Sequence, residues 1–236
     1  MMELVGVSHG LTLHQLSRWE ELANSLGAEH WHIYDTGFPD FDAKTNQVTV
    51  VPNNQFEFGG YLAGAQSVQT EGPYVILNST VFQTRSLWAW KRIIREYPRC
   101  VAPLYGDATP SPDTGIVEIP HPYYASWIFL IRDKKILTDF IRVVEQVLNI
   151  TPLEFSASYE SYLNRWLKPS SRLYGWHGVK TPNALARKMQ TIKWEHRLSK
   201  ELDVLGAQSF ANLSSWHPTA QLCDKILRHW ASFVKS

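Results

Sequence analysis

Segments that favour strands alternate with segments that favour helices over residues 4–80, and this order limits the fold more than any single motif does. Residues 11–28 place leucine and tryptophan at helical spacing and end near Gly27, whereas 73–80 contains a short apolar run typical of a buried strand. The expected strands are 4–8, 30–37, 47–54 and 73–80, and the expected helices are 11–28 and 58–69. This alternation favours an α/β fold, in which helices flank a mostly parallel sheet.

The rest of the chain is richer in helices. Residues 134–149 gather apolar side chains on one face and predict an amphipathic helix after the strand-like segment 126–132. The proline-rich segment 101–122 predicts extended chain rather than helix. Further helices are expected at 86–97, 157–167, 182–205 and 218–234, and a further strand at 172–178. We therefore expect one α/β domain over 1–180 and a helical C-terminal appendage over 181–236.

The composition argues against several classes of protein. The chain has 23 Lys and Arg against 22 Asp and Glu, so its formal net charge of +1 gives no overall field that attracts nucleic acid. No window approaches the roughly 18–20 consecutive apolar residues of a membrane span. The first residues lack the basic start and apolar stretch of a signal peptide. Cys100 and Cys223 form no disulfide framework and match no metal-ligand spacing. These features predict a soluble, cytoplasmic protein.

Polar residues follow two of the strand-like segments. Asp35 comes directly after Tyr34, and Asn78, Ser79 and Thr80 come directly after an apolar run. In open α/β sheets, ligands bind outside the carboxyl ends of the strands. Asp, Asn, Ser and Thr also close strands by hydrogen-bonding to their own backbone in turns. Both interpretations remain open at this point.

The order of these segments resembles the nucleotide-binding half of glycosyltransferases with the GT-A fold, of the family 2 type. "YDTGF" (34–38), "NNQFEFGGYLAGA" (53–65) and "VILNST" (75–80) stand where that family has a strand-ending Asp, an Asn with a Gly-rich helix start, and a strand ending in D-x-D. The resemblance implies that 1–84 hold a nucleotide sugar and that 85–180 hold the acceptor. It assigns donor binding to Asp35, Asn53, Asn54, Gly59, Gly60, Asn78, Ser79 and Thr80.

The D-x-D motif of that family is replaced here by Asn78-Ser79-Thr80, which has no carboxylate. Mg²⁺ and Mn²⁺ prefer carboxylate oxygens, so this triad does not support the divalent cation that the resemblance implies, and we predict no metal ligand. Cations can neutralise a diphosphate instead. The candidates are Arg85, Lys91, Arg92 and Arg132, and the alternative for each is a solvated helix face.

The second half resembles the acceptor side of the same family. Residues 156–178 lie where that family has an acidic general base, then a strand and a His. The base takes the proton of the attacking sugar hydroxyl as the bond from the anomeric carbon to phosphate breaks. Glu160 is the candidate base and Glu195 the alternative, while His177 and His121 are candidates for contact with phosphate or a metal. Exposed helical positions for the two glutamates, and structural roles for the two histidines, are the competing explanations.

Residues 218–234 predict a basic amphipathic helix. One interpretation is an anchor at the membrane surface, which would bring the protein to a lipid-linked acceptor at the inner face of the membrane. The other is a C-terminal helix that packs on the core.

The resemblance implies a hexosyltransferase-like enzyme that moves a sugar from a nucleotide-sugar donor to a glycan or lipid-linked glycan in polysaccharide biosynthesis, such as capsule or O-antigen. A second hypothesis is a catalytically inactive GT-A-like module that binds a glycan or a partner enzyme, which the missing D-x-D favours. A third is a nucleotidyltransferase, but "VGVSHGLTLHQ" (5–15) lacks the basic Gly-rich loop that such enzymes use. No P-loop or dinucleotide-binding fingerprint is present.

Overall fold

A computed structural model describes residues 1–43, 47–83, 101–102, 104–110, 120–124, 126–150, 156–168 and 183–209. The central sheet has the strand order β3 (Val48–Val50), β2 (Ala28–Asp35), β1 (Met2–Ser8), β4 (Tyr74–Asn78), β8 (Ile128–Ile131), β5 (Val101–Ala102) and β9 (Gln208–Ser209). β1 to β4 are parallel to one another, whereas β8 runs antiparallel to its neighbours β4 and β5. β6 (Leu104–Pro110) and β7 (Pro120–Tyr124) form a separate antiparallel pair.

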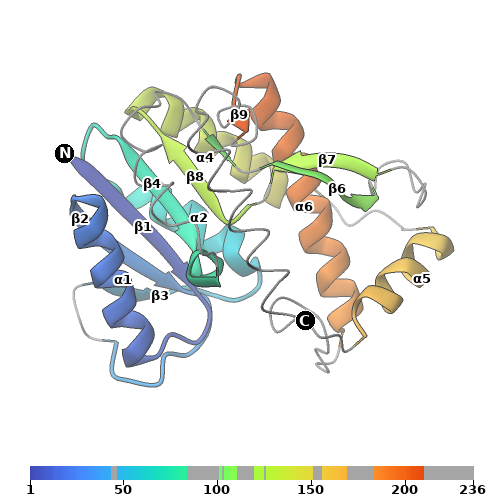
Figure 1. Cartoon of the computed structure of the whole chain (residues 1–236), viewed down its shortest axis with the longest axis horizontal. Helices are drawn as coiled ribbons and strands as arrows, with labels where there is room; N and C mark the ends of the chain where they lie inside the picture. Colours follow the sequence, from blue (N-terminus) through green and yellow to red (C-terminus); the bar gives the residue numbers. More distant parts are fainter. Residues whose placement is uncertain are drawn as a thin grey trace, which may run out of the picture.

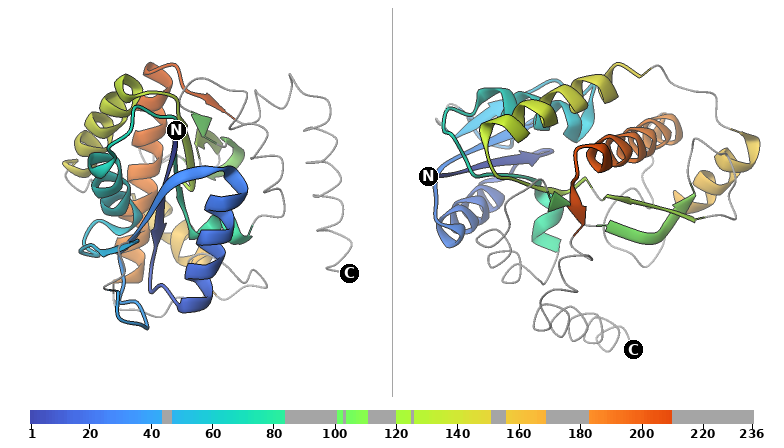
Figure 2. Two further views of the ribbon diagram at one scale, coloured as in Figure 1. Left: turned by 90° about the vertical axis from the view of Figure 1, so that its left-hand side faces the viewer. Right: turned by 90° about the horizontal axis from the view of Figure 1, so that it is seen from above.

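Helices cover both faces of the central sheet (Figures 1 and 2). α1 (Leu13–Leu26) lies on one face, and α2 (Phe56–Ser67), α4 (Lys134–Leu148) and α6 (Ala184–Val204) lie on the other (Figure 2, right). α5 (Ala157–Trp166) packs against α6 and stands apart from the parallel strands (Figure 1). This arrangement confirms the predicted α/β class with a mostly parallel sheet.

Successive residues of β4 supply two different cores. Tyr74 and Ile76 join the core beneath α2, α4 and α6, whereas Val75 and Leu77 join the core beneath α1. Neighbouring side chains of a strand point to opposite faces, so a strand covered on both sides reads as a continuous apolar run. Coverage on both faces therefore explains the apolar run 75–77.

α1 is bounded by local caps at both ends. The backbone N–H of Gln15 donates to the Thr12 hydroxyl, and the backbone N–H of Thr12 donates to the Gln15 side chain. This reciprocal capping box fixes the first turn. Gly27 then ends the helix in the left-handed conformation, with φ of 70°. The cap holds residues 9–12 at the carboxyl end of β1.

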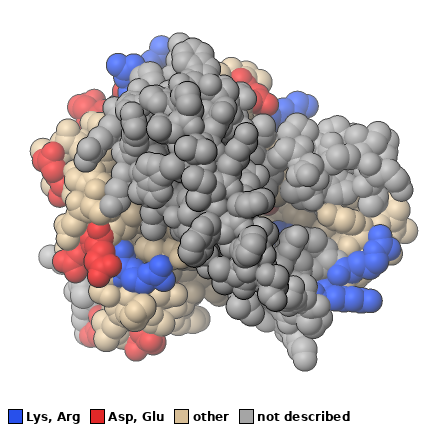
Figure 3. All heavy atoms as spheres, viewed as in Figure 1, with Lys and Arg blue, Asp and Glu red and all other residues tan. Residues whose placement is uncertain are grey.

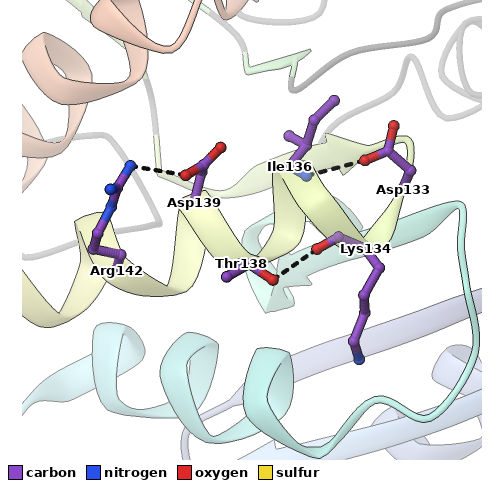
Figure 4. A network of polar contacts seen from close by, with 6 residues as sticks. All are labelled: Asp133, Lys134, Ile136, Thr138, Asp139 and Arg142. Carbon is purple, nitrogen blue, oxygen red and sulfur yellow. Dashed lines mark hydrogen bonds and ion pairs between the residues drawn. The ribbon is translucent and has the colours of Figure 1, made fainter.

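α4 also begins at a side-chain cap (Figure 4). The backbone N–H of Ile136 donates to Asp133 Oδ1 at 3.0 Å, and Arg142 pairs with Asp139 at 2.8 Å one turn further along. Lys134 Nζ donates to the backbone carbonyl of Val68, just after α2, at 3.0 Å. This bond joins the start of α4 to the end of α2, so the two helices lie side by side.

α2 lies close to the sheet because of its glycines. A Cβ at Gly60 would stand 2.6 Å from Val7 Cγ1, and one at Gly64 would stand 2.2 Å from Val5 Cγ1. Such distances leave no room for a side chain. Gly60, which the resemblance assigned to donor binding, therefore lies in the contact between α2 and β1.

α6 contributes to the main core. Trp194, Leu198 and Leu202 are buried together with residues of α2 and α4, and β9, which follows α6, joins the sheet edge. Residues 183–209 therefore belong to the α/β unit, although we expected an appendage from residue 181 onward. The elements expected at 86–97, 172–178 and 218–234 lie outside the described residues.

Candidate functional site at the carboxyl edge of the sheet

The four parallel strands end at one edge of the sheet. Their last residues are Ser8, Asp35, Val50 and Asn78, and the register pairs Ser8 with Asp35 and Val7 with Asn78. Because β8 runs antiparallel, its first residues lie at the same edge, where the backbone N–H of Asn78 donates to the Trp127 carbonyl at 3.0 Å. In open α/β sheets this edge is the usual place for ligands.

Asp35 lies at this edge but is enclosed by the loop after β1. It is 0% exposed. Its Oδ1 accepts the backbone N–H of Gly10 at 2.8 Å and of Gly37 at 3.0 Å, and its Oδ2 accepts the N–H of Leu11 at 2.9 Å. Three backbone bonds use most of the acceptor capacity of one carboxylate. In this structure Asp35 holds the loop between β1 and α1 in place.

The Asn78-Ser79-Thr80 triad forms the turn at the end of β4. Asn78 Oδ1 accepts the backbone N–H of Thr80 at 3.0 Å, which is an Asx turn, and a 3₁₀ helix, η1 (Ser79–Gln83), follows. The amide of Asn78 is thus engaged in local structure. Ser79 and Thr80 are half-buried, and their side-chain hydroxyls have no hydrogen-bond partner in the described ranges.

A chain of hydrogen bonds leads from Asn78 to the carboxylate of Glu195 on α6. Asn78 Nδ2 donates to Tyr61 Oη at 2.8 Å, and Tyr61 Oη donates to the Ser126 carbonyl at 2.5 Å. The hydroxyl of Ser126 then donates to Glu195 Oε1 at 2.8 Å. The alternative base of the sequence analysis is thus connected to the end of a parallel strand.

Glu57, in the first turn of α2, lies close enough to Glu195 for their charges to interact. Burial and the nearby Glu195 carboxylate raise the pKa of Glu57 from 4.5 to about 7, while Lys188 opposes the rise. Burial and the charge of Glu57 also raise the pKa of Tyr61 well above 10, so its hydroxyl keeps the proton that it donates to Ser126. A carboxyl group that titrates near neutral pH is suited to proton transfer.

Aromatic contacts hold the first turn of α2 against α6. The ring of Phe56 lies 5.9 Å from Trp194 and 4.6 Å beneath the guanidinium of Arg187, and Phe58 lies 5.5 Å from Trp194. Phe56 has φ of 51°, a left-handed conformation that is rare for an aromatic residue. Strained backbone of this kind is concentrated at functional sites. It occurs here directly beside Glu57.

Glu160, the first candidate base, lies elsewhere. It is an exposed residue in the first turn of α5, and α5 packs on α6 through Tyr159 and Leu163. Lys and Arg side chains lie over α5 on the face shown in Figure 3. The structure therefore does not bring Glu160 to the edge that holds Asp35 and Asn78.

The other candidates are placed as follows. Asn53 and Asn54 form the turn before α2, at the carboxyl edge, and Gly59 lies within the first turns of that helix. Arg132 follows β8 and lies beside the amino end of β4, at the opposite edge, so it is placed away from a phosphate at the strand ends. Arg85, Lys91, Arg92, His177 and the side chain of His121 lie outside the described residues.

The sequence analysis missed Glu57, Tyr61 and Ser126. Glu57 and Tyr61 stand within the quoted segment 53–65, where a carboxylate in the first turn of a helix that begins at the strand ends was a usable signal. No sequence feature near Ser126 predicted a role in the site, because its contacts depend on the direction of β8.

The described residues contain no group of three or more His, Cys, Asp or Glu side chains placed to hold a metal ion. None of their helices has the length and apolar character needed to cross a membrane.

Comparison with known proteins assigns this chain neither a family nor a function. No family model matches the chain, and no curated protein matches it. Among solved structures it is similar to 2-C-methyl-D-erythritol 4-phosphate cytidylyltransferase from Thermus thermophilus, with a TM-score of 0.36 and 11% identity over 82% of this chain and 99% of that chain. A likeness of this size carries no functional argument, so the α/β class stands on the strand order and helix layers described above.

Proposed function

We propose that this chain is a glycosyltransferase that uses a nucleotide sugar as donor and Glu195 as general base. The observation that carries the proposal is the position of Glu195 and Glu57 together at the carboxyl edge of a mostly parallel sheet. The segment order that resembles the GT-A fold supports the same function. So do the hydroxyls of Ser79 and Thr80 at the end of β4.

The chemistry needs one base in a direct displacement with inversion. The oxygen of an acceptor hydroxyl bonds to the anomeric carbon while the bond from that carbon to the phosphate oxygen breaks. The nucleoside diphosphate leaves with the electron pair, and the carboxylate of Glu195 takes the hydroxyl proton. The raised pKa of Glu57 favours its protonated form, which does not repel the phosphates of the donor.

The donor would lie along the ends of β2, β3 and β4, with Asn53, Asn54, Ser79 and Thr80 as its contacts. The acceptor, a glycan or lipid-linked glycan, would approach from α6. We assign the reaction to polysaccharide biosynthesis in the cytoplasm or at the inner face of the membrane, on the resemblance and the composition. The negative charge of the diphosphate would be neutralised by cations such as Arg85 or by a divalent ion bound with the donor.

The first test is a thermal-shift screen with UDP, GDP, CDP and dTDP sugars, each with EDTA and with Mn²⁺. A donor at about 100 times its Kd adds about 2.7 kcal/mol to the free energy of unfolding, which raises Tm measurably. A shift that persists in EDTA supports a metal-independent transferase, and a shift that requires Mn²⁺ shows a metal-dependent donor site.

The second test is Glu195→Gln in an assay of donor hydrolysis and transfer. We expect kcat to fall by about 10²–10⁴-fold because proton transfer is lost, while the donor still raises Tm. A Glu195→Gln variant with unchanged kcat would show that another group is the base.

A catalytically inactive binding module is the second candidate function. It is favoured by the engagement of Asp35 and of the Asn78 amide in backbone bonds, since two of the predicted donor ligands have little acceptor capacity left. A wild-type chain that binds a glycan but neither binds nor hydrolyses any nucleotide sugar would establish this function instead.

A further inference from the structure

Ser126 occupies a position that joins the sheet to the carboxylate of Glu195. Its side chain is buried, at 3% exposure, and its hydroxyl donates to Glu195 Oε1 at 2.8 Å. Ser126 directly precedes Trp127 and β8, so its place is set by the sheet, whereas Glu195 belongs to the helix layer. A hydrogen bond from a rigid element fixes the orientation of a long side chain on a neighbouring element.

The second carboxylate oxygen of Glu195 differs from the first in its contacts with the described residues. Glu195 Oε2 has no hydrogen-bond partner in the part of the chain that the structure describes, and the side chain is half-buried. A carboxylate with one oxygen held and one oxygen available has the arrangement that a general base needs.

Ser126 also has a second bond, on its main-chain carbonyl. Tyr61 Oη donates to this carbonyl at 2.5 Å and accepts from Asn78 Nδ2 at 2.8 Å. Asn78 in turn accepts the backbone N–H of Thr80. Tyr61 is fully buried, so this part of the chain of bonds is shielded from water and its geometry is restricted.

We propose that Ser126 is a positioning residue that holds Oε1 of Glu195, leaves Oε2 to take the proton of the acceptor hydroxyl, and links the base to the end of β4 through Tyr61 and Asn78. The inference rests on the proposed function, since it takes Glu195 as the base. It adds a residue that the resemblance did not assign, and it explains why Ser126 is buried with both its hydroxyl and its carbonyl engaged.

The test compares Ser126→Ala with Ser199→Ala. Ser199 serves as the control because it is also a buried serine beside Glu195, but its hydroxyl bonds to main-chain groups and not to the carboxylate: it donates to the carbonyl of Glu195 at 2.9 Å and accepts the N–H of Tyr124 at 2.6 Å. We expect Ser126→Ala to lower kcat about tenfold with the donor KM unchanged, and Ser126→Thr, which keeps the hydroxyl, to recover most of the loss. Ser199→Ala should keep kcat within about twofold.

A second measurement does not depend on activity. The side-chain carboxyl ¹³C signal of Glu195 is identified by its loss in Glu195→Gln. Its chemical shift should change in Ser126→Ala, change less in Tyr61→Phe, and stay the same in Ser199→Ala. An unchanged signal and an unchanged kcat in Ser126→Ala would overturn the inference. A wild-type chain that transfers no sugar contradicts the proposed function, and the carboxyl signal then decides separately whether Ser126 holds Glu195.

Discussion

Asp35 and the Glu57–Glu195 pair are carboxylates at the same edge of one sheet, yet their surroundings differ in kind. Asp35 is fully buried, and its two oxygens accept three backbone N–H bonds from the turns around it. Glu57 and Glu195 come from two helices and are half-buried. Within the described residues, Ser126 is the one residue whose side chain donates a hydrogen bond to either of them.

This difference separates a structural acid from a candidate catalytic one. A carboxylate whose oxygens are engaged by the backbone stabilises a loop and has little capacity left for a ligand. Burial and a neighbouring carboxylate favour the protonated form of Glu57 and so raise its pKa. The position of an acid at a strand end is therefore weaker evidence of function than its unused hydrogen-bonding capacity.

The largest effect is expected for Asp35→Ala. Three backbone N–H groups, that of the buried Leu11 and those of the half-buried Gly10 and Gly37, would lose their acceptor, and a buried loss of this kind costs about 1–3 kcal/mol, so we expect the free energy of unfolding to fall by about 3–5 kcal/mol. Urea denaturation measures this change. The control is Asp40→Ala, an exposed residue of the loop after β2, which should change stability by less than about 0.5 kcal/mol. If Asp35→Ala changed the free energy of unfolding only slightly but abolished donor binding, Asp35 would be a donor-binding residue after all.

The second largest effect is expected on the pH dependence of the free energy of unfolding. The folded-state pKa of Glu57 is raised to about 7 from 4.5. The stabilising contribution of Glu57 to the free energy of unfolding is therefore fully present below pH 4.5 and is lost as the pH rises through about 7. The upper limit of that loss is roughly 3 kcal/mol. Glu57→Gln should therefore flatten the fall in stability over this window, as measured by denaturation at several pH values. Equal pH dependence in wild type and variant would refute the raised pKa.

A smaller effect is expected on the pKa of Glu57 when its neighbour Glu195 is changed. Glu195→Gln removes the nearby negative charge, so the pKa of Glu57 should fall by about 0.5–1. It should stay above 4.5, because burial, the larger cause, remains. Lys188→Met should act with the opposite sign and raise this pKa, since Lys188 lowers it. Carboxyl ¹³C titration measures both changes, and the absence of any response to Glu195→Gln would mean that the two glutamates do not form a pair.

The smallest effect is expected for Glu160→Gln. Glu160 is exposed on α5, away from the strand ends, so the change should alter stability by less than about 0.5 kcal/mol and leave the transfer rate within about twofold. The transfer assay used for Glu195→Gln measures both variants side by side. A loss of tenfold or more in Glu160→Gln alone would make Glu160 the base and reverse the assignment.

The local sequence predicted the elements well and the site only in part. Helical spacing and the caps at Thr12 and Asp133 are local features, and the helices expected at 11–28 and 134–149 are confirmed as α1 and α4. Asn78 was expected at a strand end and lies there. Glu195 was named as an alternative base, but nothing near it in sequence distinguishes it from a glutamate on a solvated helix.

The amino-acid sequence by itself determined the strand and helix periods, the order of the elements and hence the α/β class, because these depend on residues within a few positions of one another. The tertiary structure alone decided which acids meet. Ser126 and Glu195 are 69 positions apart, and they come together because β8 runs antiparallel and α6 packs across α2. It also decided that Asp35 is enclosed, since its donors come from the loop after β1, 24 and 25 positions earlier, as well as from the adjoining Gly37. Contacts over such separations depend on packing, which local patterns do not encode.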